Sequence, residues 1–289
     1  QLSELILTYE QHPDLFVEDL LGVTPQDWQR EMMEAATKNR KLSLRSGHGL
    51  GKTACCSWLM IWYLLTRYPV KVVCTAPSAS TLYDGLMAET KRWVKELPKP
   101  IRNLLEIKSD RIELASSPTE AFLSARTSRP ESPESLAGIH QSNVMILVDE
   151  ASGVPEQVYE AAYGSMSGKN AVVILIGNPT RSSGYFWETH TRLRDSWWTK
   201  KVSCLDSPLV SPEFIAEMRE KYGDQSNAMK VRVYGEFPTA EDDTLISLHA
   251  VEQATQREVI QPEDTEVVWG LDVARYGDDA SVLCIRCGR

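Results

Sequence analysis

Two uninterrupted apolar runs constrain the fold of this chain more than any other feature. Residues 144–148 read V-M-I-L-V, and residues 171–176 read A-V-V-I-L-I. Strands of this kind are buried on both faces, which is typical of a parallel sheet covered by helices. A further strand is predicted over 70–75, and helical segments are predicted over 52–68 and 80–97. The sequence therefore predicts an α/β domain with a doubly wound, mostly parallel sheet.

Segments rich in glycine, proline or polar residues follow the predicted strands directly. These segments are 45–53, 75–78, 149–150 and 177–180. The carboxyl ends of parallel strands meet at one edge of the sheet, and ligands of such sheets bind there. We therefore expect the four segments to form one site. Shorter runs over 111–114 and 121–125 are predicted to pair as strands.

The first segment follows a short predicted strand over 41–45 and reads R-S-G-H-G-L-G-K-T. A phosphate-binding loop has Gly, four residues and then Gly-Lys-Ser/Thr, and here Ser46 stands at the first glycine position. Glycines let backbone N–H groups converge on phosphate oxygens, and the helix that follows adds the positive end of its dipole. We expect Lys52 to reach the β and γ phosphates of a nucleotide and Thr53 to bind Mg²⁺. The alternative is a tight turn, which the position between an apolar strand and a helix disfavours. The predicted nucleotide-binding set is Arg45, Ser46, Gly47, His48, Gly49, Leu50, Gly51, Lys52, Thr53 and Ala54.

Polar residues at the ends of the two apolar strands complete a predicted hydrolysis site. Asp149 is expected to hold Mg²⁺, and Glu150 is expected to orient the attacking water as a general base. An acidic pair at a strand end is common by itself, but here it lies about 100 residues after a phosphate-binding loop in a predicted parallel sheet. Asn178 is predicted to lie near the γ-phosphate as a sensor. The alternative for Asn178 is a turn, because Asn-Pro favours turns.

The helical residues before the loop contain a possible contact for a base. Thr24 and Pro25 are predicted to cap and begin a helix. The Gln29 amide can pair with the edge of adenine, and Trp28 can pack against the base. The alternative for Trp28 is a position in the helix core. No N-K-x-D motif occurs in the chain, which disfavours a guanine-specific switch.

The composition favours a globular protein without a general coat of positive charge. Apolar residues make up 42% of the chain, enough for a substantial core, and the formal net charge is −9. A solvated helix face and a local patch for nucleic acid remain equal alternatives for one basic cluster: Lys91, Arg92, Lys95, Lys99, Arg102, Lys108 and Arg111. The cysteine usage is typical of a reducing cytosol, and the Cys284–Cys287 pair would need two more ligands to hold zinc. The longest charge-free run, 53–66, is shorter than the ~20 residues that span a membrane.

Four parts of the chain are predicted from these patterns. Residues 1–40 are an N-terminal helical region with the possible base contact, and residues 41–237 are the α/β core. Residues 238–265 are polar and acid-rich, which is typical of a linker with one possible short helix over 248–258. Residues 266–289 are predicted to form a hairpin, which is marginally stable alone, so we expect the sequence to be a piece of a longer protein. Asp272 on its first strand is a possible metal ligand.

A set of motifs in this order resembles the large terminase subunit of tailed bacteriophages or a prophage, the motor that packages viral DNA. The resemblance spans nearly the whole chain, and the set is more specific than any one motif. It comprises W-Q at 28–29, R-S-G-H-G-L-G-K-T at 45–53, C-T-A-P-S at 74–78, L-A-G-I-H at 136–140, M-I-L-V-D-E-A-S at 145–152, I-G-N-P-T at 176–180, Y-G-E-F-P at 234–238 and W-G-L-D-V-A at 269–274.

The resemblance implies a P-loop ATPase core of the ASCE type, a linker and the first hairpin of an RNase H-like nuclease domain. It implies that ATP and Mg²⁺ are cofactors, that Glu150 and Lys52 are catalytic, and that Thr53 and Asp149 bind Mg²⁺. Asn178 would belong to a motif that couples hydrolysis to DNA movement. Asp272 would be the first ligand of a divalent metal, Mg²⁺ or Mn²⁺, at a nuclease site. Because further nuclease carboxylates would lie after residue 289, we expect no DNA cleavage by this chain.

The position of an activating arginine differs from that in some members of the family. Those members have an arginine inside the phosphate loop, where this chain has His48, and Arg45 stands just before the loop. Others are thought to use an arginine from a neighbouring subunit, and Arg126 and Arg129 are both available in the corresponding loop. Because such an arginine contributes several orders of magnitude in rate, we expect slow hydrolysis by the isolated chain.

The resemblance also implies partners and a place in the cell. The partners would be double-stranded DNA, the portal protein and the small terminase subunit, with self-association into a ring, expected to be pentameric, on the portal. The protein would be in the host cytoplasm, transiently docked on the procapsid and absent from the mature virion, with no membrane contact. A helicase-like DNA-dependent ATPase and a nucleotide-controlled assembly switch remain as alternatives.

Overall fold

The structure is a computed structural model of the chain. It describes residues 2–128, 136, 138–165, 168, 170–239, 254, 266–274 and 281–287. The chain divides into two compact units, Gln1–Asp242 and Asp243–Arg289. Arg129 and nearly all of the predicted linker, including its possible short helix, lie outside the described residues.

An eight-stranded sheet forms the centre of the first unit, in the order β3-β4-β5-β2-β6-β7-β1-β8. Six neighbouring strands are parallel, namely β5, β2, β6, β7, β1 and β8. At one edge of the sheet, β3 and β4 are antiparallel. This confirms the predicted mostly parallel α/β fold. The strands are β1 (Lys41–Ser46), β2 (Val70–Thr75), β3 (Leu105–Ile107), β4 (Arg111–Leu114), β5 (Ala121–Ala125), β6 (Asn143–Val148), β7 (Asn170–Gly177) and β8 (Trp198–Val202).

The strand order brings three of the predicted segments to adjacent positions. β7 lies between β1 and β6, so that Val173 pairs with Lys41 on one side and with Ile146 on the other. The segment after β7 therefore lies between the phosphate loop, which follows β1, and the acidic pair, which follows β6. Placing one strand between these two is the arrangement expected of the ASCE type.

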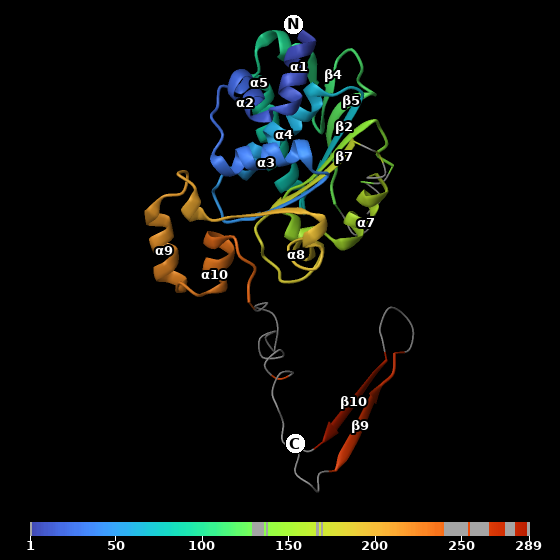
Figure 1. Ribbon diagram of the computed structural model, residues 1–289, viewed down its shortest axis with the longest axis vertical. Coiled ribbons are helices and arrows are strands. Elements are labelled where there is room, and N and C mark those ends of the chain that lie inside the picture. The colour runs from blue at the N-terminus through green and yellow to red at the C-terminus, as the bar shows by residue number, and fades with distance from the viewer. Residues whose placement is uncertain are drawn as a thin grey trace. The chain divides into compact units, whose positions relative to one another are not determined.

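Helices cover the sheet on both faces (Figure 1). On one face, α4 is almost wholly buried and joins a large apolar cluster that includes Trp62 and Tyr63. On the other face, a second apolar cluster includes Val158 of α7 and Phe186 of α8. The first face carries α1 (Leu2–Gln11), α2 (Pro13–Leu21), α3 (Asp27–Lys38), α4 (Lys52–Thr66), the π-helix η1 (Thr81–Met87), α5 (Ala88–Glu96) and the short α6 (Lys99–Arg102). The second carries the 3₁₀-helix η3 (Ala151–Gly153), α7 (Glu156–Ser165) and α8 (Tyr185–Thr189).

Two predicted helices differ in detail from the structure. The predicted start at Thr24 and Pro25 is wrong, because α3 begins at Asp27. The reason is the Gln29 side chain, whose Oε1 accepts a hydrogen bond from the Gln26 backbone N–H at 2.8 Å and so caps the helix two residues later. The helix predicted over 80–97 is a π-helix followed by an α-helix rather than one regular helix.

A small subdomain follows the sheet and ends close to the phosphate loop. Its apolar cluster comprises Cys204, Ile215, Met218, Met229 and Val233. The sequence patterns did not predict these helices, which Figure 1 shows beside the sheet as α9 and α10. The elements after α8 are the 3₁₀-helices η4 (Arg194–Ser196) and η5 (Cys204–Asp206), α9 (Pro212–Tyr222), α10 (Asn227–Met229) and the π-helix η6 (Lys230–Tyr234).

The second unit contains an antiparallel hairpin of β9 (Val267–Asp272) and β10 (Val282–Cys287). Asp272, the last residue of β9, pairs with Val282, the first residue of β10. Large apolar side chains of both strands, including Trp269 and Leu271, are exposed within the chain. Among the described residues, no helix has the length and apolar character needed to cross a membrane.

Candidate nucleotide site

The predicted phosphate loop connects β1 to the first turn of α4. Gly49 and Gly51 have positive φ angles of 73° and 84°, a region that favours glycine. The first N–H groups of α4, which begins at Lys52, have no partners inside the helix and are available to an anion. Leu50 is buried in the large apolar cluster, while His48 and Gly49 are exposed. The loop thus has the backbone geometry of a phosphate-binding loop.

The first half of the loop lies against the small subdomain. The N–H of Gly47 donates to the Val202 carbonyl at 3.1 Å, and the N–H of His48 donates to the Arg232 carbonyl at 2.8 Å. A Cβ atom at Gly47 would lie 2.5 Å from the Cys204 sulfur and 2.7 Å from the Val233 carbonyl oxygen. Only glycine fits between these atoms, so residue 47 is a position of close backbone approach.

Ser46 occupies the first position of the loop without disturbing it. Its side chain is fully buried, and its hydroxyl donates to the Gly47 carbonyl at 3.1 Å. The close contact on this side comes instead from Gly235, where a Cβ would lie 2.8 Å from the Ser46 Cα. The glycine needed at this close contact is therefore residue 235. Residue 46 can carry a small hydroxyl side chain, although the general pattern has glycine at that position.

Lys52 and Asn178 connect the loop to the end of β7. The Lys52 Nζ donates to the Gly47 carbonyl at 2.8 Å and to the Asn178 Oδ1 at 3.3 Å. The Asn178 Nδ2 donates to the Ser46 carbonyl at 2.6 Å. Both side chains are buried, and burial lowers the pKa of Lys52 while the carboxylates of Glu150 and Asp149 oppose this change. The structure thus brings these two predicted site residues into direct contact.

The acidic pair lies at the end of β6. Asp149 is 4% exposed, and one of its carboxylate oxygens accepts the Glu150 N–H at 2.9 Å. Burial raises the pKa of Asp149 to about 6, and the neighbouring Glu150 carboxylate contributes to this increase. Glu150 has a φ of 48°, the one positive φ of a non-glycine residue in the described part of the chain. A buried carboxylate beside a strained, half-exposed one is typical of a functional site.

The end of β7 lies directly against the acidic pair. A Cβ at Gly177 would lie 2.8 Å from the Ala151 nitrogen and 3.0 Å from the Glu150 Cα. Ser152, which the sequence patterns did not single out, connects the two strand ends. Its hydroxyl donates to the Asn178 carbonyl at 2.8 Å and accepts the Thr180 N–H at 3.3 Å. The signal in the sequence was the serine that follows the acidic pair within D-E-A-S.

Thr53 and Asp149 have side-chain oxygens of the kind that bind Mg²⁺. Hard oxygen ligands suit this ion, and few protein ligands suffice because it keeps several waters. Thr53 lies on the first turn of α4, next to Lys52, and the charge of the Asp149 carboxylate opposes the lowering of the Lys52 pKa by burial. Burial raises the pKa of the Cys56 thiol, and this carboxylate raises it further. No group of three or more His, Cys, Asp or Glu side chains in the described residues could hold a metal without other ligands.

Trp28 and Gln29 lie beside the second half of the phosphate loop. Trp28 is 4% exposed and belongs to the large apolar cluster. The Gln29 Nε2 donates to the Gly51 carbonyl at 3.4 Å, and the Gln26 Nε2 donates to the Leu50 carbonyl at 3.2 Å. Gln26 was not predicted, and its only sequence signal was a polar residue shortly before W-Q. A contact of Trp28 or Gln29 with adenine stays a prediction.

The arginines near the site have different surroundings. The Arg45 guanidinium donates to the Gly235 carbonyl at 2.9 Å and lies 5.0 Å from the centre of the Phe237 ring. Burial lowers its pKa. Arg126 follows β5 at the same edge of the sheet, where its N–H donates to the Cys74 carbonyl at 2.9 Å. Arg129 lies outside the described residues, so a role for Arg126 or Arg129 stays a prediction.

Two further predictions concern the basic cluster and Asp272. Several basic side chains of the cluster form ion pairs. The distance between nitrogen and oxygen is 2.6 Å for Arg92 and Glu89 and 2.8 Å for Arg111 and Glu113. These contacts fit the solvated-face alternative for at least part of the cluster. Asp272 belongs to the second unit. Its role as a metal ligand stays a prediction.

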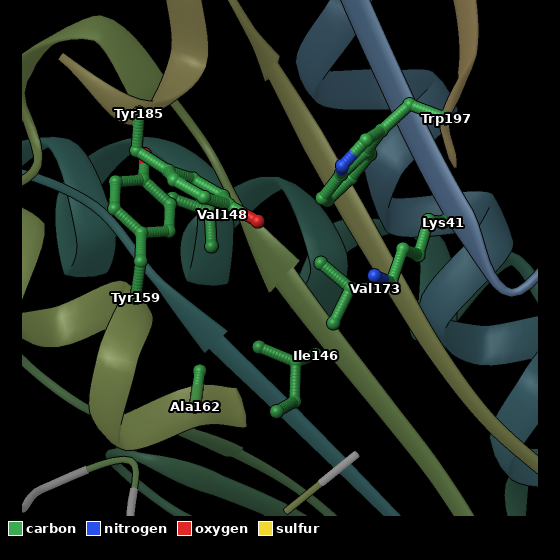
Figure 2. A pocket seen from close by; sticks show the side chains of 8 residues that line it. All are labelled: Lys41, Ile146, Val148, Tyr159, Ala162, Val173, Tyr185 and Trp197. Atoms are coloured by element: carbon green, nitrogen blue, oxygen red, sulfur yellow. The ribbon is translucent and has the colours of Figure 1, made fainter. Parts of the chain in front are cut away.

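An apolar pocket lies on the face of the sheet that α7 and α8 cover (Figure 2). Figure 2 shows the rings of Tyr159 and Tyr185 side by side, with centres 4.8 Å apart, and Trp197 and Lys41 across the pocket from them. The Lys41 Nζ lies 5.8 Å from the centre of the Trp197 ring. The described residues that line the pocket include no carboxylate, thiol or histidine. The pocket therefore lacks groups for the predicted hydrolysis chemistry.

Comparison with known proteins agrees with the motifs and the fold. No protein-family model matches the chain. The chain is 30% identical over 98% of its length to a protein of Enterobacteria phage P7 named probable terminase, large subunit, and it spans 60% of the length of that relative.

Solved structures of phage large terminases have the same fold. The ATPase domain of the Thermus phage P74-26 large terminase superposes with a TM-score of 0.59 and 17% identity, covering 78% of this chain and 99% of that one. The large terminase of a thermophilic bacteriophage in complex with ADP superposes with a TM-score of 0.62 and 14% identity, covering 91% of this chain and 65% of that one. The shared fold, the sequence identity and the order of motifs make this chain similar to phage terminase large subunits over nearly its whole length.

Proposed function

We propose that this chain binds and hydrolyses ATP and that the hydrolysis powers movement of double-stranded viral DNA into a procapsid. The observation that supports this most is the junction of three strand ends. Lys52 after β1 contacts Asn178 after β7, and the acidic pair follows β6 beside them. The relatives add support, because one is named a terminase large subunit and another was solved with ADP.

The proposed binding of the phosphates uses backbone and charge together. The N–H groups of the loop and of the first turn of α4 bind the phosphate oxygens, and Lys52 reaches the β and γ phosphates. The Thr53 hydroxyl and the Asp149 carboxylate hold Mg²⁺, which neutralises phosphate charge when bound. Burial makes each of these charges act more strongly than it would in water. The site residues thus stabilise the charge that develops during hydrolysis.

Glu150 is the proposed general base. A carboxylate next to the γ-phosphate can accept a proton from the attacking water and orient that water. Its backbone conformation is held by the close contact with Gly177 and by the hydrogen bonds of Ser152 to the segment after β7. Asn178 contacts Lys52 and the Ser46 carbonyl at once. Loss of the γ-phosphate at Lys52 would therefore change the hydrogen bonds of Asn178, which is the basis of its proposed sensor role.

The activating arginine is proposed to come from a neighbouring copy of the protein in a ring. The Arg45 guanidinium donates a hydrogen bond to the Gly235 carbonyl and lies over the Phe237 ring. It is therefore poorly placed to reach a γ-phosphate. Arg126 lies at the correct edge of the sheet, and Arg129 follows it in the sequence. Either residue would supply charge to the site of the next subunit, and the isolated monomer would hydrolyse ATP slowly.

The activities and partners of the whole protein are proposed from its resemblance to phage large terminases, because the chain spans 60% of its relative. The partners are double-stranded DNA, the portal protein and the small terminase subunit, with a pentameric ring on the portal. A nuclease site that includes Asp272 and binds Mg²⁺ or Mn²⁺ would cut the DNA. The protein would act in the host cytoplasm on the procapsid and be absent from the mature virion. Because the net charge is −9, we expect DNA binding through a local surface that is sensitive to salt.

Substitution of Glu150 tests the proposed hydrolysis. Glu150→Gln removes the general base but preserves the size of the side chain. We expect ATP affinity to be retained and turnover to fall about 10²–10⁴-fold, the usual contribution of such a base. Calorimetric titration with ATP and a phosphate-release assay measure the two quantities. Glu156→Gln, at an exposed carboxylate on the first turn of α7, is the matched control.

Two results would contradict the proposal. Unchanged turnover in Glu150→Gln would remove the catalytic role of this residue. Turnover of the unsubstituted protein that stays negligible with double-stranded DNA and the portal protein present would favour a nucleotide-controlled assembly switch instead.

A further inference from the structure

Two glutamines at the start of α3 hold the second half of the phosphate loop. The Gln26 Nε2 donates to the Leu50 carbonyl at 3.2 Å, and the Gln29 Nε2 donates to the Gly51 carbonyl at 3.4 Å. We call Gln26 and Gln29 the glutamine pair. Gly51 has a φ of 84°, a region that favours glycine.

Because of peptide geometry, these contacts also orient the N–H groups of Gly51 and Lys52. A trans peptide is planar, and its C=O and N–H point in opposite directions. The Leu50 carbonyl belongs to the same peptide as the Gly51 N–H, and the Gly51 carbonyl to the same peptide as the Lys52 N–H. Drawing both carbonyls towards α3 therefore turns the N–H groups of Gly51 and Lys52 away from α3. These are N–H groups that the proposed function assigns to phosphate.

Both the oxygen and the nitrogen of each carboxamide in the glutamine pair already have a partner within the protein. The Gln29 Oε1 accepts the Gln26 N–H at 2.8 Å, and Gln29 is 2% exposed. The Gln26 Oε1 accepts the Ser207 hydroxyl at 2.7 Å and the Trp28 indole N–H at 3.3 Å. A glutamine that reads adenine presents both its oxygen and its nitrogen to the edge of the base. A base that paired with either glutamine in this way would compete with these contacts, and Gln29 is nearly inaccessible.

We propose that Gln26 and Gln29 are positioning residues for the phosphate loop and do not read the base. They orient the N–H groups that bind phosphate, so their effect is the same for every nucleotide and for a polyphosphate without a base. Ser207, in the segment after η5, fixes the Gln26 carboxamide and so connects the small subdomain to the loop. This inference rests on the proposed function, since it assumes that the loop binds phosphate.

Gln→Glu substitutions test the proposal with little change in shape. Gln29→Glu retains the oxygen that caps Gln26 but loses the donor to Gly51, and Gln26→Glu loses the donor to Leu50 in the same way. We expect each to lower the affinities for ATP, GTP and inorganic tripolyphosphate by a common factor of about ten, the loss typical of one buried hydrogen bond. The ratios between the three affinities should stay those of the unsubstituted protein. Equilibrium titration of the full chain with each compound measures them.

Two further variants serve as controls for the Gln→Glu substitutions. Gln157→Glu, at an exposed position on α7, makes the same chemical change and should leave all three affinities unaltered. Ser207→Ala leaves α3 intact and should lower the three affinities by a smaller common factor. Thermal unfolding of each variant verifies that it is folded.

The outcomes separate this proposal from the function on which it rests. If the unsubstituted protein binds ATP, but Gln29→Glu weakens ATP alone and leaves GTP and tripolyphosphate unchanged, Gln29 reads the base and the proposal is wrong. Unchanged affinities in both Gln→Glu variants would also overturn it. An unsubstituted protein that binds none of the three compounds would overturn the proposed function, and this proposal with it.

Discussion

Gly47 illustrates how a single residue type can be required by contacts that are distant in the sequence. The Cys204 sulfur and the carbonyls of Arg232 and Val233 all lie within 3.0 Å of the position where its Cβ would be. These groups belong to the small subdomain that follows the sheet. The motif pattern leaves residue 47 free to vary, because the general phosphate-binding loop has no glycine requirement there. The structure therefore adds a restriction that the pattern lacks.

A Gly47→Ala substitution tests this restriction. The added methyl would meet backbone carbonyls that cannot move aside easily, so the loop must shift. We expect the free energy of unfolding to fall by about 1–3 kcal/mol, as in other overpacked sites, and ATP affinity to fall as well. Chemical denaturation and ATP titration measure these changes. Gly85→Ala, where a Cβ meets nothing within 4 Å, is the matched control. Equal behaviour of the two variants would contradict the predicted crowding at residue 47.

At the scale of elements, β1 joins the two apolar layers although its sequence alternates. Leu42 and Leu44 belong to the large apolar cluster, while Ser43 faces the other layer and is also fully buried. The Ser43 hydroxyl lies 2.6 Å from Thr189 Oγ1 and 3.0 Å from His190 Nε2. An alternating pattern usually indicates one solvated face. Here the second face is buried because the end of α8 satisfies the polar side chain.

This contact predicts a pH dependence of stability. Burial lowers the pKa of His190 to about 3, and the positive charges of Arg45 and Arg194 contribute. In the unfolded chain the pKa of histidine is about 6.5, so between these values the unfolded state binds a proton that the folded state does not. His190 therefore makes the free energy of unfolding decrease as pH falls through this window, by at most about 1.4 kcal/mol per pH unit.

Denaturant titrations of the original protein and of His190→Gln at several pH values measure this effect. The difference in stability between the two should change in favour of the variant as pH falls from 7 to 4. His12→Gln, at an exposed position, is the matched control. Parallel pH curves for the original protein and His190→Gln would show that this buried histidine has no such influence.

At the scale of the whole molecule, the described apolar clusters all lie in the first unit. The three clusters and the side chains packed on them come from residues before 238, while the second unit, Asp243–Arg289, contributes a hairpin. The candidate nucleotide site is built entirely from the first unit as well. We therefore expect the first unit to fold and bind nucleotide independently of the second.

Deletion of residues 243–289 tests this independence. We expect the midpoint of thermal unfolding to change by less than about 2 °C, since 1 kcal/mol already shifts the midpoint of a domain of this size by about 2–4 °C. ATP affinity should be retained. A longer deletion that begins at Asn227 removes Met229 and Val233 from the small apolar cluster and should lower both quantities. A large loss of stability in the shorter deletion would show that the two units stabilise each other.

The strands and the site residues differed in how well they could be predicted from the sequence. The apolar runs predicted β2, β6 and β7 to within a residue or two of their ends. The edge strand β8 was missed because its residues, W-T-K-K-V, are mostly half-exposed and lack an apolar run. Gln26, Ser152 and Cys204 were missed for a different reason. Their roles depend on contacts with backbone atoms elsewhere in the chain, which no local pattern records.

The sequence by itself determined that a glycine-rich loop, an acidic pair and an asparagine follow buried strands, because strand burial and loop chemistry are local properties. Only the tertiary structure decided which of these strands are neighbours, and therefore that Lys52 contacts Asn178. It also decided that Arg45 contacts Gly235 and Phe237 instead of the loop, and that the glutamine pair holds the loop carbonyls. The physical reason is that hydrogen bonds depend on distances of about 3 Å between atoms, and chain folding alone sets these for residues far apart in the sequence.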